Sequence, residues 1–306
     1  MTWDIRVFFA YVVVVLTWST TPLAIYFSNS SLTFITAVTV RMILALLGFG
    51  LLMLVLRKRL VDSPKDWWVF AASALGLFPN MLLVYWAVQY IPSGLMSVLM
   101  GIYPFFVGLM SIWILRDNPF TPKKIGALCV AVAGLAVIHY GQLQVGADAV
   151  KGVFAVLLAC FFWAISVTLV KKMGAHIDPI RHNTGSLLIA TPLFFLVWLL
   201  VDGQIPVAVD TKSFWAVIYL VVCGSLISHS LYFYVIRHCT VSTVSLITLM
   251  TPVLALTWGI LFANEVLSQP LIIGAAFIFV GLGAYLNLGL IGSVAQRAYG
   301  RIKSFI

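Results

Sequence analysis

Charge is scarce in this sequence. Only 9% of its 306 residues are Asp, Glu, Lys or Arg, whereas 62% are hydrophobic, and the mean hydropathy is +1.10. A water-soluble domain carries roughly a quarter charged residues and could not bury so much apolar surface. The shortage of charge therefore excludes a soluble domain and predicts a protein whose solvent is a lipid bilayer.

Motifs for chemistry are also missing. The four cysteines show no CxxC pair and no Cys/His ligand spacing, so we predict no metal site and no cofactor. We find no HExxH, no paired intramembrane Asp and no convincing Ser/His/Asp arrangement, which disfavours an intramembrane enzyme and leaves no catalytic residue to name. The net charge of +9 arises between apolar runs, so it indicates membrane orientation rather than nucleic-acid binding.

Long apolar runs are what the sequence does contain. A helix needs about 20 apolar residues to cross the hydrocarbon core, because its backbone must be hydrogen-bonded internally there. We predict an all-α integral membrane protein with ten transmembrane helices. The expected spans are 7–27, 34–56, 67–89, 93–115, 123–141, 150–170, 183–201, 214–236, 241–263 and 270–290.

Lys and Arg alternate between the two sides of these spans. One set of ends holds fifteen basic residues and the opposite set holds two, Lys151 and Lys212. Positive charge is retained on the cytoplasmic side. We therefore expect a multi-pass protein of the cell (inner) membrane with both termini in the cytoplasm.

The two halves of the chain resemble each other. At an offset of 148 residues, Gly76 aligns with Gly224, Pro104 with Pro252, and the IGA at 125 with the IGA at 273. Five spans per copy is an odd number, so the copies would enter the membrane from opposite sides, as in alternating-access transporters. We expect an inverted pair of five-helix repeats. Their bounds are 7–141 and 150–290, followed by a basic cytoplasmic tail at 291–306.

Several motifs together carry a family resemblance. They are TWSTTPLAI in the first span, VTVRMILALL in the second, YP and TP in the fourth and ninth, and an acidic residue followed by IGA at the fifth and tenth. With the repeat, this set resembles the ten-helix drug/metabolite transporter superfamily, EamA type, over roughly residues 7 to 290. The resemblance implies a central cavity lined by helices 1 to 4 and 6 to 9. Two departures are Asp117, where Glu is commoner, and Arg181, which we expect in a loop rather than a span.

Polar residues inside the spans are the candidate substrate ligands. Arg41 lies in the second span, where an unpaired guanidinium costs about 2.5 kcal/mol or more. It could snorkel to the outer interface, or it could face the cavity and attract a carboxylate. His229 and Asn80 fall near the midplane of matching spans, and His229 could either be a buried structural residue or carry coupling protons.

Aromatic residues complete the predicted cavity. Trp18, Tyr85, Tyr103 and Trp163 are the candidates for its wall, and the repeat-related Pro104 and Pro252 are candidate kinks for gating. The expected partners are a small-molecule substrate and the lipid bilayer, with coupling protons as a candidate and no nucleic acid; the sequence does not specify an oligomeric state.

A secondary transporter that exports an amino acid or similar amphipathic metabolite is the leading interpretation. An exporter of drugs or quaternary cations would normally place an Asp or Glu at the centre of a span, to bind the cation and a proton in turn. No span has one, so efflux of drugs or quaternary cations is an alternative and not the leading interpretation. Nucleotide-sugar or sugar-phosphate exchange would usually need more than one buried cation. A channel and an intramembrane enzyme are alternatives from other classes.

Overall fold

A computed structural model of the chain describes residues 5–145, 147–173, 177–206, 208–238, 241–266 and 268–285, and these residues form helices and connections without a strand. The predicted tail at 291–306 lies outside them. The helices are α1 (Ile5–Ser28), α2 (Phe34–Val55), α3 (Asp66–Ala74), α4 (Asn80–Ala87), α5 (Ser93–Met100), α6 (Tyr103–Met110), the π-helix η1 (Ser111–Leu115), α7 (Pro122–Val145), α8 (Ala147–Lys172), α9 (Pro179–Val201), α10 (Thr211–Val221), the π-helix η2 (Val222–Ile227), α11 (Ser228–His238), α12 (Val241–Ala263) and a last helix, Gln269–Tyr285.

Six helical stretches are long and apolar enough to cross a bilayer, and the shorter apolar helices Met250–Ala263 and Gln269–Tyr285 add to them. The six are Ile5–Ser28, Phe34–Val55, Ser93–Leu115, Asp148–Lys172, Pro179–Val201 and Thr211–Tyr232. The predicted all-helical class is therefore confirmed.

The predicted span 67–89 is not one continuous helix. It consists of α3 and α4, separated by turns at residues 75–79. Pro79 has no N–H to donate to a preceding carbonyl, so a regular helix cannot continue through it. The new helix begins directly after it, with Pro79 as the N-cap residue of α4.

The seventh predicted span begins earlier than expected, and the prediction that Arg181 lies in a loop is wrong. Asp178 caps α9 by accepting a hydrogen bond from the Ile180 N–H, and Pro179 occupies the first turn, where a missing N–H costs nothing. Arg181 therefore lies in the first turn of α9. Its guanidinium bonds the Leu60 carbonyl and pairs with Asp62 and Asp66.

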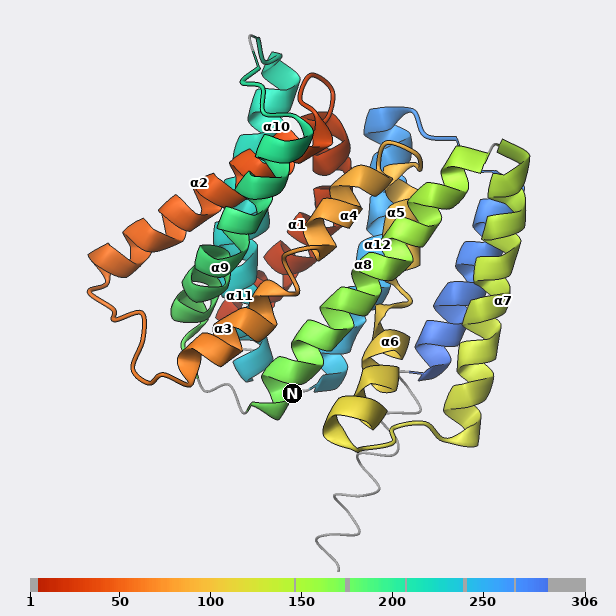
Figure 1. The fold of residues 1–306 in the computed structure, drawn as a ribbon. Helices are drawn as coiled ribbons and strands as arrows, with labels where there is room; N and C mark the ends of the chain where they lie inside the picture. The colour runs from red at the N-terminus through yellow and green to blue at the C-terminus, as the bar shows by residue number, and fades with distance from the viewer. Residues whose placement is uncertain are drawn as a thin grey trace, which may run out of the picture.

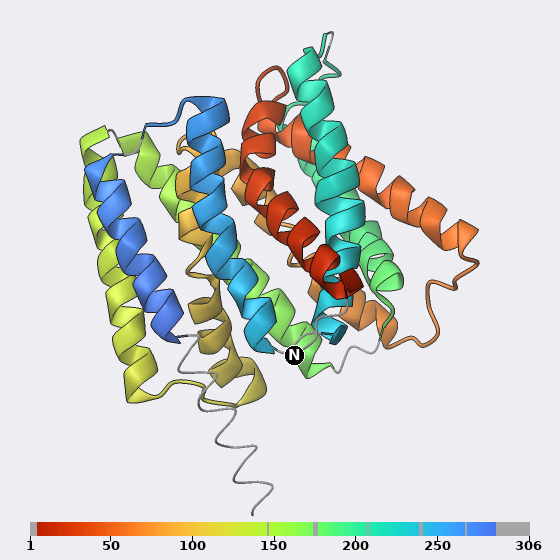
Figure 2. The same cartoon turned by 180° about the vertical axis from the view of Figure 1, so that it is seen from behind.

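The helices run between two ends of a bundle (Figures 1 and 2). We call the end with the α1–α2 turn, the start of α10 and the α12 C-terminus the acidic end, after Asp202, Asp210 and Glu265. The opposite end, with the α2–α3 connection and the start of α9, is the basic end. At the basic end, Lys58 Nζ pairs with Asp178 Oδ2 at 2.7 Å, joining the α2–α3 connection to α9.

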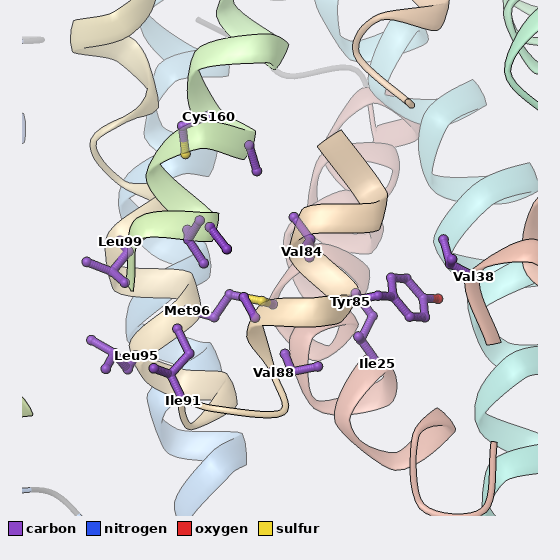
Figure 3. Close-up of a cluster of buried hydrophobic side chains, with 14 of the residues drawn as sticks. Ile25, Val38, Val84, Tyr85, Val88, Ile91, Leu95, Met96, Leu99 and Cys160 are labelled. Atoms are coloured by element: carbon purple, nitrogen blue, oxygen red, sulfur yellow. The ribbon is translucent and has the colours of Figure 1, made fainter. Parts of the chain in front are cut away.

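A dense apolar core lies between α4, α5 and α8 (Figure 3). Leu95, Leu99 and Cys160 are fully buried in it. Tyr85 belongs to the same cluster and extends from α4 away from Leu95 and Leu99, toward Val38 on α2. Packing in this core therefore fixes the rotation of α4, and the face that carries Tyr85 is directed toward α2.

The helices α7 and Gln269–Tyr285 lie beside each other at one side of the bundle (Figures 1 and 2). Their backbones approach closely at two glycines: a Cβ added at Gly134 would lie 2.5 Å from the Gly274 carbonyl oxygen, and one at Gly274 would lie 2.6 Å from the Gly134 carbonyl oxygen. Small residues at such crossings let membrane helices pack by van der Waals contact.

Gly274→Val is expected to lower stability, because its side chain would collide with backbone that cannot move aside. Overpacking costs about 1–3 kcal/mol, and we expect a lower midpoint in thermal unfolding of the purified protein. Gly283→Val on the same helix is the matched control, since a Cβ there meets nothing within 4 Å. Equal midpoints for the two variants would contradict the close crossing.

Candidate substrate cavity

A cavity of about 140 Å³ lies among the helices. It is lined from α1, α2, α4, α5, α6, α8, η2, α11 and α12. The lining residues are Trp18, Thr21, Pro22, Ile25, Arg41, Met81, Val84, Met96, Ser97, Met100, Gly101, Tyr103, Trp163, Gly224, His229, Thr251 and Pro252. Neither α7, α9 nor the last helix contributes to this lining.

Arg41 lies inside the protein and only 2% of it is exposed, so the snorkelling interpretation is wrong. Its guanidinium donates to Ser225 Oγ at 3.2 Å, to the Tyr85 hydroxyl at 3.3 Å and to the Gly224 carbonyl at 3.5 Å. All three acceptors are neutral. Arg41 forms no ion pair with the residues that the structure describes.

Aromatic rings form one wall of the cavity. Tyr103 and Trp163 stack with their centroids 4.0 Å apart, and Trp163 meets Trp18 edge-on at 6.5 Å. Trp18 in turn contacts Tyr232 at 4.6 Å and His229 at 6.4 Å. The wall joins α1, α6, α8 and α11, so residues from both halves of the chain hold each other in place.

His229 is the second residue of α11, two residues after the end of η2. Its Nδ1 lies 3.1 Å from the Gly224 carbonyl oxygen, the same oxygen that Arg41 Nη2 approaches. The π-helix widens the backbone spacing here, and such segments often occur at functional sites. His229 and Arg41 therefore share one side of the cavity.

The structure corrects two of the predicted cavity residues, Asn80 and Tyr85. Asn80 points to α8, where its Nδ2 donates to the Ala159 carbonyl at 2.7 Å. Tyr85 does not line the cavity, because its hydroxyl reaches only as far as the Arg41 guanidinium. Pro104 lies in the first turn of α6, directly after the break at residues 101–102 that divides the helical stretch Ser93–Leu115, whereas Pro252 lies within α12 and lines the cavity.

Three methionines in the lining were missed by sequence reasoning. Met96 and Met100 are one helical turn apart on α5, and Met81 follows Asn80 on α4. Flexible thioethers make favourable contacts with aromatic rings and adapt to different ligands. In the sequence, Met96 and Met100 lie one helical turn apart beside the polar Ser97, which could have indicated a face toward a cavity. A methionine in an apolar run, however, cannot be distinguished by sequence from an ordinary core residue.

A smaller void of about 20 Å³ continues from Arg41 and His229. Ala45 and Phe49 line it from α2, and Asn183 and Leu187 line it from α9. Both α2 residues follow Arg41 toward the basic end. The seventh span, expected at the main cavity, is therefore found at this extension instead.

The acidic end is held together by carboxylates of the second half, which accept hydrogen bonds from the first half. Asp202 Oδ2 accepts from the Thr36 hydroxyl at 2.7 Å and also from Thr33, and these hydroxyls hold the pKa of Asp202 below its usual range. Asp210 Oδ2 accepts from the Ser30 hydroxyl at 2.7 Å.

Glu265 makes the third of these contacts. Its Oε1 accepts from the Ser93 N–H at 2.7 Å and the Ser93 hydroxyl at 2.6 Å, and its Oε2 accepts from the Gly94 N–H at 3.0 Å. These donors begin α5, so a carboxylate of the second half caps a helix of the first. We call these Glu265 contacts the α5 latch.

Comparison with known proteins identifies the family. The EamA-like transporter family matches residues 5–140 and 150–286. The chain belongs to this family. The resemblance inferred from the sequence motifs is confirmed, and the protein is a multi-pass membrane transporter of the drug/metabolite transporter superfamily.

Similar proteins occur in bacteria and archaea. The uncharacterized transporter YoaV of Bacillus subtilis is 25% identical over 79% of this chain and 83% of its own length. Protein PecM of Dickeya dadantii is 25% identical over 76% of this chain and 77% of its own. An uncharacterized transporter of Archaeoglobus fulgidus is 24% identical over 87% of this chain and 93% of its own.

A solved crystal structure shares the fold. It superposes with a TM-score of 0.64 over 92% of this chain and 96% of the other, at 18% sequence identity. At that identity the likeness extends to the fold and not to the substrate.

Proposed function

We propose that this protein is a secondary transporter that exports a small amphipathic metabolite bearing a carboxylate, with apolar amino acids as the first class to test. The observation that carries the proposal is the buried guanidinium of Arg41, which has no ion pair with a described residue, in a cavity walled by Trp18, Tyr103 and Trp163. A guanidinium binds a carboxylate through strong charge-assisted hydrogen bonds, and the aromatic wall suits an apolar group.

Alternating access between two inverted repeats is the proposed mechanism. The two family matches, at 5–140 and 150–286, support a division of the chain into 7–141 and 150–290 and a count of ten spans. The excess of Lys and Arg at the basic end supports a cytoplasmic position for that end. The α5 latch, Asp202 and Asp210 would then close the outer side, while the cavity extends inward along α2.

The same geometry disfavours the alternatives. None of the eight described Asp and Glu residues lines the cavity, so a quaternary cation would find no counter-charge there. A sugar phosphate or nucleotide sugar would meet one guanidinium only, and a predominantly apolar lining instead of hydrogen-bonding partners for its hydroxyls.

Counterflow in proteoliposomes tests the proposal. Purified protein is expected to exchange a labelled apolar amino acid saturably against an unlabelled one, whereas a channel would give sustained current without counterflow. Absence of saturable exchange for every amino acid and simple carboxylate tried would refute the proposed function.

Trp163→Ala is expected to reduce this exchange at least about tenfold. Aromatic pairs contribute about 0.5–1.5 kcal/mol beyond the area they bury, and this indole contacts both Tyr103 and Trp18. Trp113→Ala, on a side chain that is 76% exposed toward the outside of the bundle, is the matched control. Equal exchange by the two variants would remove Trp163 from the site.

Coupling protons are proposed to act at His229. Its ring lies beside Trp18 and shares the Gly224 carbonyl with Arg41, so a change in its charge would be felt at the binding site. Flux through the native protein is expected to respond to an imposed pH gradient, and His229→Gln is expected to lose this response while retaining exchange. A variant that kept the response would exclude His229 from coupling.

A further inference from the structure

The Arg41 charge in the cavity has no counter-charge among the residues that the structure describes. Arg41 is 2% exposed. The three acceptors of its hydrogen bonds, Ser225, Tyr85 and Gly224, are all neutral. Buried charges in proteins are normally paired, because leaving one unpaired in a low-dielectric interior is costly. The counter-charge that this cavity lacks must therefore come from what binds in it.

The described acidic residues lie outside the cavity. Eight of the nine are described, and each lies at or beyond a helix end. Asp62, Asp66 and Asp178 pair with cations at the basic end, and Asp148 pairs with Lys151. Asp202, Asp210 and Glu265 accept hydrogen bonds at the acidic end. The remaining one, Asp117, lies between η1 and α7.

Arg41 also has donors to spare. A guanidinium carries five N–H groups, and three of them are used, at 3.2, 3.3 and 3.5 Å. These distances are at or beyond the long end of the usual range of about 2.7–3.2 Å. Such bonds orient the side chain and leave it able to bind a carboxylate more closely.

The rest of the wall suits an apolar group. Met81, Met96 and Met100 line the cavity together with the rings of Trp18, Tyr103 and Trp163. A cavity of about 140 Å³ is close in volume to a cavity of about 150 Å³ that holds benzene in another protein. One aromatic ring or branched chain fits it.

Net charge distinguishes two kinds of carboxylate. A monocarboxylate would neutralise Arg41, whereas a zwitterion would bring an ammonium with it and leave the cavity at a net charge of +1. The ammonium would find hydroxyls of Thr21, Ser97 and Thr251 and the aromatic faces, but no carboxylate among the described lining residues.

We infer that the cavity selects small apolar organic anions with a net charge of −1 over zwitterions of the same size. This inference rests on the proposed function and narrows it, since amino acids become the weaker ligands. The expected substrates have one aromatic ring or branched chain joined to a single carboxylate, with no amino group.

Three compounds with the same carbon frame test this inference. They are 3-phenylpropionate, phenylalanine and phenethylamine, which are anionic, zwitterionic and cationic at neutral pH. We expect thermal stabilisation of the purified native protein to give 3-phenylpropionate at least about tenfold tighter binding than phenylalanine, equivalent to about 1.4 kcal/mol, and no binding of phenethylamine. Arg41→Lys keeps the positive charge and is expected to keep this order, whereas Arg41→Gln is expected to lose it.

Transport gives a second readout. Exchange of 3-phenylpropionate for phenylalanine in proteoliposomes moves net charge, so an imposed membrane potential should change its rate, whereas phenylalanine self-exchange should not respond. Tighter binding of phenylalanine than of 3-phenylpropionate, together with saturable counterflow, would overturn this inference and leave the proposed function standing. Failure of all three compounds to bind would overturn this inference, and absence of saturable counterflow for every amino acid and simple carboxylate tried would overturn the proposed function as well.

Discussion

Replacing Arg41 with glutamine is expected to reduce transport at least about 30-fold. Loss of one partner of a buried charge pair costs about 2–5 kcal/mol, and every 1.4 kcal/mol corresponds to a factor of about ten. Glutamine keeps a polar side chain but carries no charge and is two atoms shorter, so Arg41→Lys, which keeps the charge on a longer side chain, separates loss of the charge from loss of side-chain length. The measurement is initial substrate flux in proteoliposomes.

Protein stability separates a binding role from a structural one. In the substrate-free protein the Arg41 charge has no counter-ion among the described residues, so its removal should relieve a desolvation cost. We expect substrate-free Arg41→Gln protein to unfold at the same temperature as the native protein or higher. Tyr85→Phe is the companion variant, because it removes one acceptor of Arg41 and leaves the charge in place. A large fall in the unfolding temperature of Arg41→Gln would instead mark Arg41 as a structural residue.

The positions of the long helices could be predicted from the sequence, because a long run of apolar residues is a simple signal. The predicted span 34–56 corresponds to α2 at Phe34–Val55, since a run of apolar residues without proline has one way to satisfy its backbone in a bilayer. The same hydropathy signal cannot show interruptions inside a run. The turns at 75–79 between α3 and α4 and the π-helix η2 are as apolar as regular helix, so only Pro79 indicated the first of them.

Only part of the candidate site could be predicted, because composition identifies unusual residues in apolar segments but not the direction in which their side chains point. Arg41, Trp18, Trp163 and His229 are conspicuous in apolar segments, and the structure brings all of them to one cavity. Whether a helical residue faces a cavity depends on a rotation of about 100° per residue, which composition does not reveal. Asn80 therefore points to α8, although Met81, the next residue, lines the cavity.

The hydroxyls around Trp18 illustrate the same limit. The Thr17, Ser19, Thr20 and Thr21 side chains all donate to carbonyls one turn earlier in α1. Thr21 is the one of the four that also lines the cavity. Pro22 has no N–H to give to the Trp18 carbonyl, and it lines the cavity beside Trp18 and Thr21. A polar stretch in an apolar run thus mainly satisfies the backbone of its own helix.

Opening of the acidic end is expected to become easier when Glu265 is replaced by glutamine. The carboxylate holds the first two residues of α5 through three hydrogen bonds of 2.6–3.0 Å. Glutamine lacks the charge, and its amide N–H₂ group would face an N–H donor of Ser93 or Gly94 in place of an acceptor oxygen. Hydrogen bonds to charged groups contribute about 1.5–3 kcal/mol, so we expect the population open at this end to rise about tenfold or more.

Labelling of a cysteine inside the cavity measures this population. Ser97→Cys on α5, in a background without the four native cysteines, would be exposed to a membrane-impermeant thiol reagent applied to intact cells. Its labelling rate should rise about tenfold with Glu265→Gln. Asp117→Asn is the matched control, because Asp117 occupies the repeat-related position in the first half and is exposed at the basic end.

The labelling rate in Glu265→Gln also tests the proposed alternating-access mechanism. If the acidic end is the outer gate, faster labelling should be accompanied by slower net export, because the outward-open state would be favoured at the expense of the inward-facing one. Exchange from the outer side should change less. Unchanged labelling in Glu265→Gln would mean that Asp202 and Asp210 keep the end closed without the α5 latch, and that the moving element lies elsewhere in the bundle.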